Sequence, residues 1–341
     1  MASAEHVDAG PHDSLPRQSI AISQQEQEEQ SLSTANRELA AFLIQGRGYV
    51  VLRNALRLDL VDSLLRSFSE IYDDCRQTGG AQETGADVES ALQLHVANKT
   101  KATFWFRKSR WRIFPRLIPP IGDPGLLANP FVIPILEDLL GRDLFLHFVS
   151  TDTCTKGALL QSPHSDINRN GVFADNRWKP RGFIVNVPVM ECGLHNGPIE
   201  LWPGGTHLWT SHFLEEHGLS FDIQDARNPI VERLAEYFPS VRLALQPGEV
   251  LIRDLAMWHR GTPNPTDEPR TMFTLGYFRR DFVYGYGDPS FNVDEALFWQ
   301  LDPKVQKLYE SYFSFSNRLR RRQQRFRSKM KRALLALARA R

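Results

Sequence analysis

Between residues 144 and 278 the chain repeats one pattern, a short apolar run followed by a turn signal. The runs are Leu144–Val149, Phe183–Val189, Ile199–Trp202, Val241–Leu245, Val250–Arg253 and Arg270–Phe278. The turns between them include Asn196-Gly197-Pro198, Pro203-Gly204-Gly205 and Gln246-Pro247-Gly248. Short strands at regular spacing, separated by Gly and Pro turns, are typical of sandwiched or closed β-folds. We therefore predict a mainly β fold with flanking helices (α+β), whose core is a jelly roll.

Sequence upstream of this region predicts a strand and two helices. Tyr49–Arg53 has the composition of a strand, and apolar residues at helical spacing over 60–72 indicate an amphipathic helix. Residues 130–140 predict a short helix with Pro near its first turn and Gly141 after its end. Residues 81–128 contain Gly, Pro and many aromatic side chains, and we interpret them as a long, partly ordered insertion that could form a lid.

Composition at the two ends of the chain predicts three segments. Residues 1–33 are rich in Gln, Glu, Ser, Pro and Asp, which is typical of a flexible segment. Residues 34–300 would form the folded domain, with helices in its N-terminal part. Residues 301–341 would form a basic helical tail, because 318–341 carry eleven Lys or Arg and no acid while the net charge of the chain is +1. The tail is expected to contact a membrane surface, another subunit or the acidic body, and no nucleic acid is expected.

Length and cysteine content limit the class of protein further. With 341 residues, of which 42% are hydrophobic, the chain can bury a large core without disulfides. Cys75, Cys154 and Cys192 are odd in number and form no CxxC motif, so we expect a reducing, cytoplasmic setting and no thiolate zinc site. No apolar run reaches about 18 residues, so a transmembrane helix is not expected, and the N-terminus lacks the apolar core of a secretory signal.

A short His-x-Asp motif carries the candidate chemistry. His164 and Asp166 are two residues apart on an extended segment, so their side chains point to the same side. A second imidazole, His259, follows 95 residues later and can join them only through folding. Two imidazoles and one carboxylate form the facial triad of non-haem iron(II) oxygenases, which leaves coordination positions open. His-x-Asp alone is common, so the prediction depends on its context.

Arg270 supplies part of that context. It follows His259 by eleven residues, and the turn-rich sequence between them could bring its strand back beside the strand of His259. A guanidinium at that place could bind a carboxylate through two parallel hydrogen bonds. The distal carboxylate of 2-oxoglutarate requires such a partner, whereas a surface salt bridge is the simpler interpretation of Arg270 alone.

Taken in order, these motifs resemble those of the phytanoyl-CoA dioxygenase family over residues of about 40 to 280. The resemblance is carried by Gln161-Ser-Pro-His164-Ser-Asp166, by Asn196-Gly197-Pro198 followed by Pro203-Gly204-Gly205-Thr206-His207, by Pro247-Gly248-Glu249, and by His259-Arg-Gly-Thr-Pro-Asn264 with Arg270. The family usually has a small residue such as Ser where Gly205 stands, a mild departure.

This resemblance implies a double-stranded β-helix fold, an Fe(II) cofactor and 2-oxoglutarate as co-substrate. By position it implies His164, Asp166 and His259 as the metal ligands and catalytic residues, and Arg270 as the residue that binds 2-oxoglutarate. Gln161, three residues before His164, is a further candidate for binding the co-substrate. The expected reaction is hydroxylation of an unactivated C–H bond of a small molecule by O₂, with release of succinate and CO₂; biosynthetic and carrier-bound substrates are both open. Asp166 argues against chlorination, because halogenating relatives replace this carboxylate with a small residue.

Six other polar residues were weighed for a role in the site. His207 follows a predicted turn and suits a structural hydrogen bond, and His195 is expected at the surface. Asn186 lies on a predicted strand and could face either a cavity or the core. Solvated positions are expected for Lys99, Lys101 and Arg107.

Other functions remain open at this level. The chain could be a non-catalytic, metal-binding jelly-roll module that uses its basic tail to bind a partner or a membrane surface. It could be a zinc or manganese hydrolase or isomerase on the same scaffold, although such reactions need no second carboxylate clamp. It could also be a desaturase or cyclase with the same cofactors.

Overall fold

Strands with one apolar face dominate the computed structural model, which describes residues 17–79, 93–107, 109–167, 171–174, 177–208, 229–282 and 287–313. Among these residues the largest sheet has the order β1 (Ser19–Ala21), β2 (Tyr49–Arg53), β12 (Val250–Asp254), β9 (Gly182–Pro188), β14 (Arg270–Arg279), β6 (Leu144–Cys154), β5 (Arg110–Phe114), β4 (Thr103–Arg107) and β3 (His95–Val96). A smaller sheet has the order β11 (Val241–Leu243), β10 (Ile199–Leu201) and β13 (His259–Gly261), and β7 (Gly171–Ala174) pairs with β8 (Arg177–Pro180).

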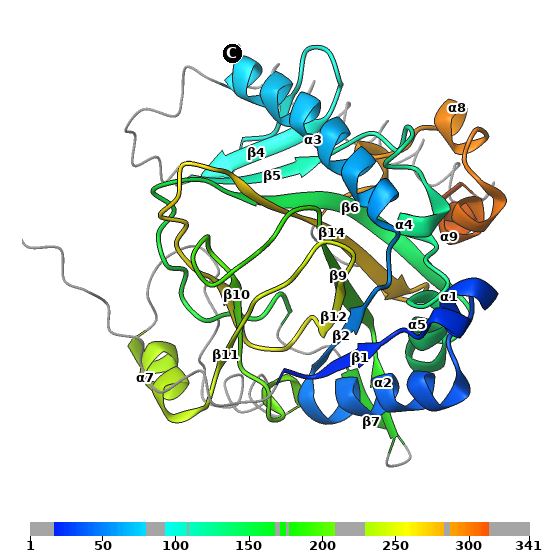
Figure 1. Cartoon of the computed structure of the whole chain (residues 1–341), viewed down its shortest axis with the longest axis vertical. Coiled ribbons are helices and arrows are strands. Elements are labelled where there is room, and N and C mark those ends of the chain that lie inside the picture. Colours follow the sequence, from blue (N-terminus) through cyan, green and yellow to red (C-terminus); the bar gives the residue numbers. More distant parts are fainter. Residues whose placement is uncertain are drawn as a thin grey trace, which may run out of the picture.

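The two larger sheets pack against each other through an apolar cluster. Leu251 of β12 and Met272 of β14 belong to the same buried cluster as Leu201 of β10 and Leu243 of β11. Because side chains alternate between the faces of a strand, this cluster defines the inner face of the large sheet. Two facing sheets with flanking helices confirm the predicted α+β fold with a jelly-roll core, and in the described residues the sheets do not close into a barrel (Figure 1).

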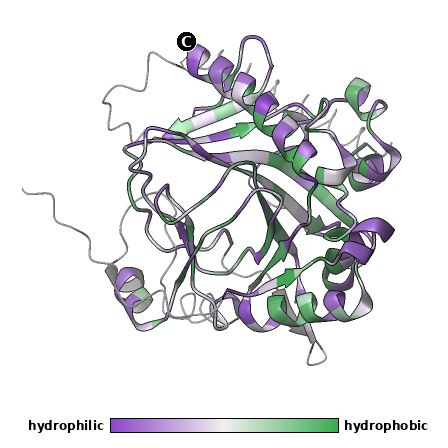
Figure 2. Cartoon of the chain, in the orientation of Figure 1, coloured by the Kyte–Doolittle hydropathy of each residue, from purple (hydrophilic) through white to green (hydrophobic). Residues whose placement is uncertain are grey.

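The helices are α1 (Gln24–Glu29), α2 (Thr34–Arg47), α3 (Leu58–Gly79), α4 (Pro124–Leu127), α5 (Ile133–Leu140), α7 (Pro229–Tyr237), α8 (Glu295–Phe298) and α9 (Pro303–Phe313), with a 3-10 turn at Pro289–Phe291. Helices such as α3 cover the outer face of the large sheet, whereas α7 lies beside the small sheet, where the carbonyl of Ala235 accepts a hydrogen bond from Trp202 Nε1 (Figure 1). Phe68 of α3 packs edge-on against Phe273 of β14, with ring centroids 6.3 Å apart. Hydrophilic and hydrophobic residues alternate along α3, as expected of a helix that lies with one face on a sheet (Figure 2). No helix in the described part of the chain is long and apolar enough to cross a membrane.

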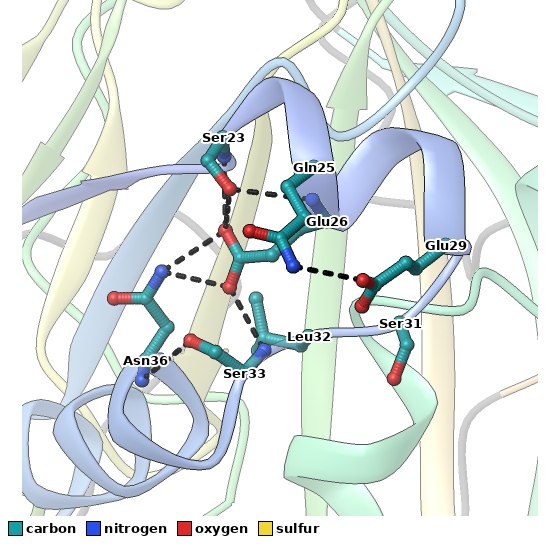
Figure 3. Close-up of a pocket in the computed structure, with 8 residues that line it drawn as sticks. All are labelled: Ser23, Gln25, Glu26, Glu29, Ser31, Leu32, Ser33 and Asn36. Carbon is teal, nitrogen blue, oxygen red and sulfur yellow. Dashed lines mark hydrogen bonds between the residues drawn. The ribbon is translucent and has the colours of Figure 1, made fainter.

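The N-terminal segment differs from the sequence prediction where it is described. Residues 17–33 belong to the expected flexible segment, but β1 pairs in parallel with β2 and α1 follows it. Glu26 of α1 is buried and accepts hydrogen bonds from Ser23, Ser33 and Asn36, which lie at the start of α1 and α2 (Figure 3). Burial alone would raise the pKa of Glu26, but these hydrogen bonds lower it to about 2. The local polar network therefore fixes this segment to the domain.

Two other segments, the expected insertion and the expected tail, also differ from the sequence prediction. The described part of the expected insertion at 81–128 contains β3, β4, β5 and α4, and β5 pairs with β6, so these strands extend the large sheet. In β4 the usual alternation is hidden, because Phe104 and Phe106 pack in one apolar cluster while Trp105 packs in another, on the opposite face. Helix α9, expected in the tail, packs on β6 through buried Val305 and Tyr309 and belongs to the domain. Residues 314–341, on which the basic-tail prediction falls, lie outside the described residues.

Candidate metal centre

The predicted metal ligands come together at the edge of the small sheet. His164 forms an antiparallel bridge with His259 of β13, in which each backbone N–H donates to the other residue's carbonyl, at 3.0 and 2.8 Å. Residues paired in this way carry neighbouring side chains on one face, and the two imidazole centroids are 4.4 Å apart. The backbone N–H of Asp166 donates to the carbonyl of Leu255 at 2.8 Å, which turns the His-x-Asp segment toward the same site.

One potential ligand atom from each of the three residues lies within 4.8 Å of the others. His259 Nε2 and Asp166 Oδ1 are 3.6 Å apart. His164 Nδ1 lies 2.8 Å from the carbonyl oxygen of Ser162, and His259 Nδ1 lies 3.0 Å from that of Met257. Both Nδ1 atoms therefore donate to backbone carbonyls, and this leaves both Nε2 atoms as acceptors aimed at the shared space.

Charge states at the centre also suit a cation. Burial lowers the pKa of His164, with a partial opposing effect from Asp166, and burial together with the charge of Arg253 lowers that of His259 well below its ordinary value. Burial would raise the pKa of Asp166, but Arg253 and the two imidazoles hold it well below its usual range. Near pH 7 the centre therefore presents two neutral imidazoles and one carboxylate, the protonation states that bind metal ions. This donor set fits a divalent ion such as Fe(II).

Arg270 occupies the first position of β14, in the large sheet. The prediction that its strand lies beside that of His259 is wrong, because β14 pairs with β6 and β9, and β13 pairs with β10 in the other sheet. Arg270 shares its strand face with Met272, whose side chain packs between the sheets, so its guanidinium points to the inside of the jelly roll. Arg270 is 3% exposed, and its Nε and Nη1 have no hydrogen-bond partner among the described residues. A buried guanidinium with free donors fits an anionic ligand.

Gln161 lies between the two segments that carry the metal ligands. Its side-chain oxygen accepts a hydrogen bond from the backbone N–H of Gly261 at 2.8 Å, and its own N–H donates to the carbonyl of Gly261 at 3.1 Å. A Cβ on Gly261 would lie 2.8 Å from the side-chain oxygen of Gln161 and 2.5 Å from Nη1 of Arg110. Gln161 thus joins the strand of His259 to the segment of His164, and its binding to a co-substrate stays a prediction.

The other polar residues considered for the site divide into a buried histidine, His207, and three exposed side chains. His207 is buried and donates from Nε2 to the carbonyl of Gln45 at 2.9 Å, and burial lowers its pKa to about 4. His195, Lys99 and Lys101 are exposed, as predicted. The structural interpretation of His207 is therefore confirmed, and none of the three exposed residues belongs to the centre.

Asn186 faces inward, toward Arg253, an arginine that sequence reasoning did not select, and a second such arginine, Arg110, lies near the ligand segments. Its neighbours Val185 and Val187 belong to the core under the helices, while its own side chain lies on the inner face near Arg253. Arg253 forms an ion pair with Asp166. Arg110 donates to the carbonyls of Leu159 and Thr262, which lie close to the two ligand segments. The available signal for Arg253 was a charged residue inside the apolar run Val250–Arg253.

Three solved structures match this chain at low sequence identity. The α-ketoglutarate-dependent epimerase SnoN from nogalamycin biosynthesis is 16% identical, with a TM-score of 0.45 over 72% of this chain and 84% of that chain. HygX from Streptomyces hygroscopicus, crystallised with nickel and 2-oxoglutarate, is 16% identical, with a TM-score of 0.45 over 74% and 89%. EctD from S. alaskensis with bound Fe is 17% identical, with a TM-score of 0.48 over 77% and 82%.

The sequence itself gives the stronger comparison. The profile of the family described as "Phytanoyl-CoA dioxygenase (PhyH)" matches residues 44–272. This range includes the His-x-Asp segment, the second histidine and Arg270, and it covers more than half of the 341 residues. The predicted family is therefore confirmed: the chain belongs to the phytanoyl-CoA dioxygenase family of 2-oxoglutarate-dependent, non-haem iron enzymes.

Proposed function

We propose that this protein is an Fe(II)- and 2-oxoglutarate-dependent dioxygenase that hydroxylates an unactivated C–H bond of a small molecule. The observation that carries the proposal is the convergence of His164, Asp166 and His259, whose ligand atoms lie within 4.8 Å of one another. Family membership supports the same cofactor and co-substrate. Iron(II) and 2-oxoglutarate, when bound, would supply the activation of O₂, with release of succinate and CO₂.

In this proposal the side chains of the centre act by position and charge. His164 and His259 hold their Nε2 atoms toward the ion, because the backbone carbonyls of Ser162 and Met257 fix both rings. Asp166 supplies the single negative charge of the ligand set. Three protein ligands on one face leave positions for the two donor atoms of a 2-oxo acid and for O₂.

Arg270 is proposed to bind the distal carboxylate of 2-oxoglutarate. Its burial and its two unpartnered donors, Nε and Nη1, support this role, because each can donate a charge-assisted hydrogen bond to an anionic ligand. The remote carboxylate would thereby orient the reacting end of the co-substrate toward the centre. Gln161 remains a candidate for a second contact to the co-substrate.

The test is 2-oxoglutarate turnover by the purified full chain, supplied with Fe(II). Succinate is measured directly, and products are screened by mass across small metabolites and carrier-bound acyl groups. A mass gain of one oxygen supports hydroxylation, whereas a loss of two hydrogens assigns a desaturase or cyclase.

Variants make this test specific for the centre. His164→Ala and Asp166→Ala are expected to abolish succinate formation that depends on substrate, while the control His195→Ala, at an exposed histidine, keeps it. Full activity in either ligand variant would refute the assignment of these residues. Metal binding without any turnover in the screen would instead favour a non-catalytic, metal-binding jelly-roll module.

A further inference from the structure

Asp166 forms an ion pair with Arg253, a residue that is not one of the three metal ligands. Nη1 of Arg253 lies 2.8 Å from Oδ2 of Asp166, while the other carboxylate oxygen, Oδ1, is the one 3.6 Å from Nε2 of His259. The side chain of Arg253 is 6% exposed and that of Asp166 is 21% exposed. The two oxygens of Asp166 are thus differentiated: one faces the imidazoles and the other faces the guanidinium.

Arg253 is itself held by a chain of polar side chains on the inner face of the large sheet. Its Nε donates to the side-chain oxygen of Asn186 at 3.3 Å, and the amide of Asn186 donates to the hydroxyl of Thr274 at 3.0 Å. The hydroxyl of Thr274 donates to Oδ2 of Asp152 at 2.8 Å, and Asp152 pairs with Arg112 at 2.7 Å. These residues come from β12, β9, β14, β6 and β5, which are consecutive neighbours in the large sheet. The row of polar side chains therefore crosses the sheet from the metal centre toward its far side.

The register of the paired strands explains why this row of polar side chains is continuous. Thr274 is the direct cross-strand partner of both Asn186 and Ser150, and Asp152 is the partner of Arg112. Cross-strand partners carry their side chains on one face at short range. A polar row on the inner face of a sheet whose outer face packs on helices therefore has a fixed geometry, and Arg253 is its last member before Asp166.

We propose that Arg253 is a positioning residue for the metal ligand Asp166. By pairing with Oδ2, Arg253 keeps the other oxygen, Oδ1, turned toward the imidazoles, where it would be available to a bound ion. This inference rests on the proposed function, because it assigns Arg253 a part in the same centre.

Arg253 has two opposing effects on a bound cation. Its ion pair orients the carboxylate, and the loss of such outer partners typically weakens metal binding by about 10- to 100-fold. Its positive charge repels the ion and acts in the opposite direction. If orientation of the carboxylate dominates, removal of Arg253 weakens metal binding. If charge repulsion dominates, removal tightens it. The sign of the measured change therefore decides between the two effects.

The experiment uses the full-length, metal-free protein and Mn²⁺ as the probe, with free Mn²⁺ followed by its EPR signal. Arg253→Met removes both the ion pair and the charge, and Arg253→Lys keeps a positive charge at the same position. Asn186→Leu keeps Arg253 but removes the acceptor that holds it.

The matched control is Arg260→Met. Arg260 forms an equally close pair with buried Glu200, at 2.7 Å, but its side chain lies on the face of β13 opposite to His259. Thermal unfolding of each metal-free variant verifies that it is folded, so that a loss of affinity cannot be attributed to a general loss of structure.

We expect Arg253→Met to bind Mn²⁺ about 10- to 100-fold more weakly than the wild type. Arg253→Lys should recover part of this loss, Asn186→Leu should shift in the same direction as Arg253→Met by a smaller factor, and Arg260→Met should match the wild type. Unchanged or tighter binding by Arg253→Met would overturn the positioning role while leaving the proposed function intact. A wild-type protein that binds no Mn²⁺ would overturn both.

Discussion

Replacing Arg270 with methionine should make the protein without co-substrate more stable and at the same time remove its response to 2-oxoglutarate. Arg270 is 3% exposed, and two of its nitrogen atoms, Nε and Nη1, have no partner among the described residues. Methionine is also long and unbranched, so it can fill much of the same space without a charge. The two expected effects have opposite signs, which makes them separable.

The size of the first effect follows from the two unpartnered donors. Each buried donor without a partner costs about 1–3 kcal/mol, so two of them cost about 2–6 kcal/mol. Because water in the cavity would replace part of the missing hydrogen bonds, we expect the lower end of this range. Arg270→Met should therefore raise the free energy of unfolding of the metal-free, ligand-free protein by about 2 kcal/mol.

The second effect is measured in the same assay. Urea unfolding is followed with Mn²⁺ present, without and with 2-oxoglutarate. A ligand that binds only the folded state at 100 times its Kd adds about 2.7 kcal/mol to the free energy of unfolding. The wild type should show this gain, and Arg270→Met should show none at the same concentration.

Arg260→Met provides the control, because it removes an arginine that already has a carboxylate partner. Breaking its pair with buried Glu200 should lower the free energy of unfolding, by about 3–5 kcal/mol if the pair behaves as fully buried. The gain from 2-oxoglutarate should remain. The reasoning about Arg270 would be refuted by an Arg270→Met variant that is less stable without ligands and still gains stability from 2-oxoglutarate.

Two further predictions concern the scaffold of the centre. The pKa of His207 falls from 6.5 to about 4 on folding. Between these two values the unfolded chain binds a proton at His207 that the folded protein does not bind, so the folded state loses stability as the pH falls. The contribution of His207 to stability is complete above pH 6.5, and about 3 kcal/mol of it is lost as the pH falls to 4. His207→Gln should flatten this part of the pH profile in urea unfolding, and an unchanged slope would contradict the buried, neutral imidazole. Gly261→Ala should weaken Mn²⁺ binding, because the new Cβ would lie 2.5 Å from Nη1 of Arg110 and 2.8 Å from the side-chain oxygen of Gln161, and would push away the Gln161 side chain that joins the strand of His259 to the segment of His164. Gly46→Ala, with nothing within 4 Å, should leave binding unchanged and add about 0.5–1 kcal/mol of stability. Equal Mn²⁺ affinity in both alanine variants would show that the packing of Gly261 does not matter to the centre.

The alternation of short apolar runs and turns was sufficient to predict most of the jelly roll. All six predicted runs between residues 144 and 278 correspond to strands of the structure, and Tyr49–Arg53 is β2 as predicted. The runs that form β9, β10, β12 and β14 bury their residues almost completely, so hydrophobicity alone marks them. The strands that were missed are short or carry mixed side chains, and β1 is held by pairing with β2, a contact that local sequence does not encode.

The sequence by itself determined which residue types could form the centre: a His-x-Asp pair on an extended segment, a distant second histidine and an arginine near it. Their convergence depends on β13 pairing with the segment of His164, and this is a long-range contact that only folding makes. The placement of β13 and β14 in different sheets, and the row of side chains from Arg112 to Arg253, were likewise decided by tertiary structure. Strand pairing sets which side chains share a face, and a single chain order is compatible with more than one pairing.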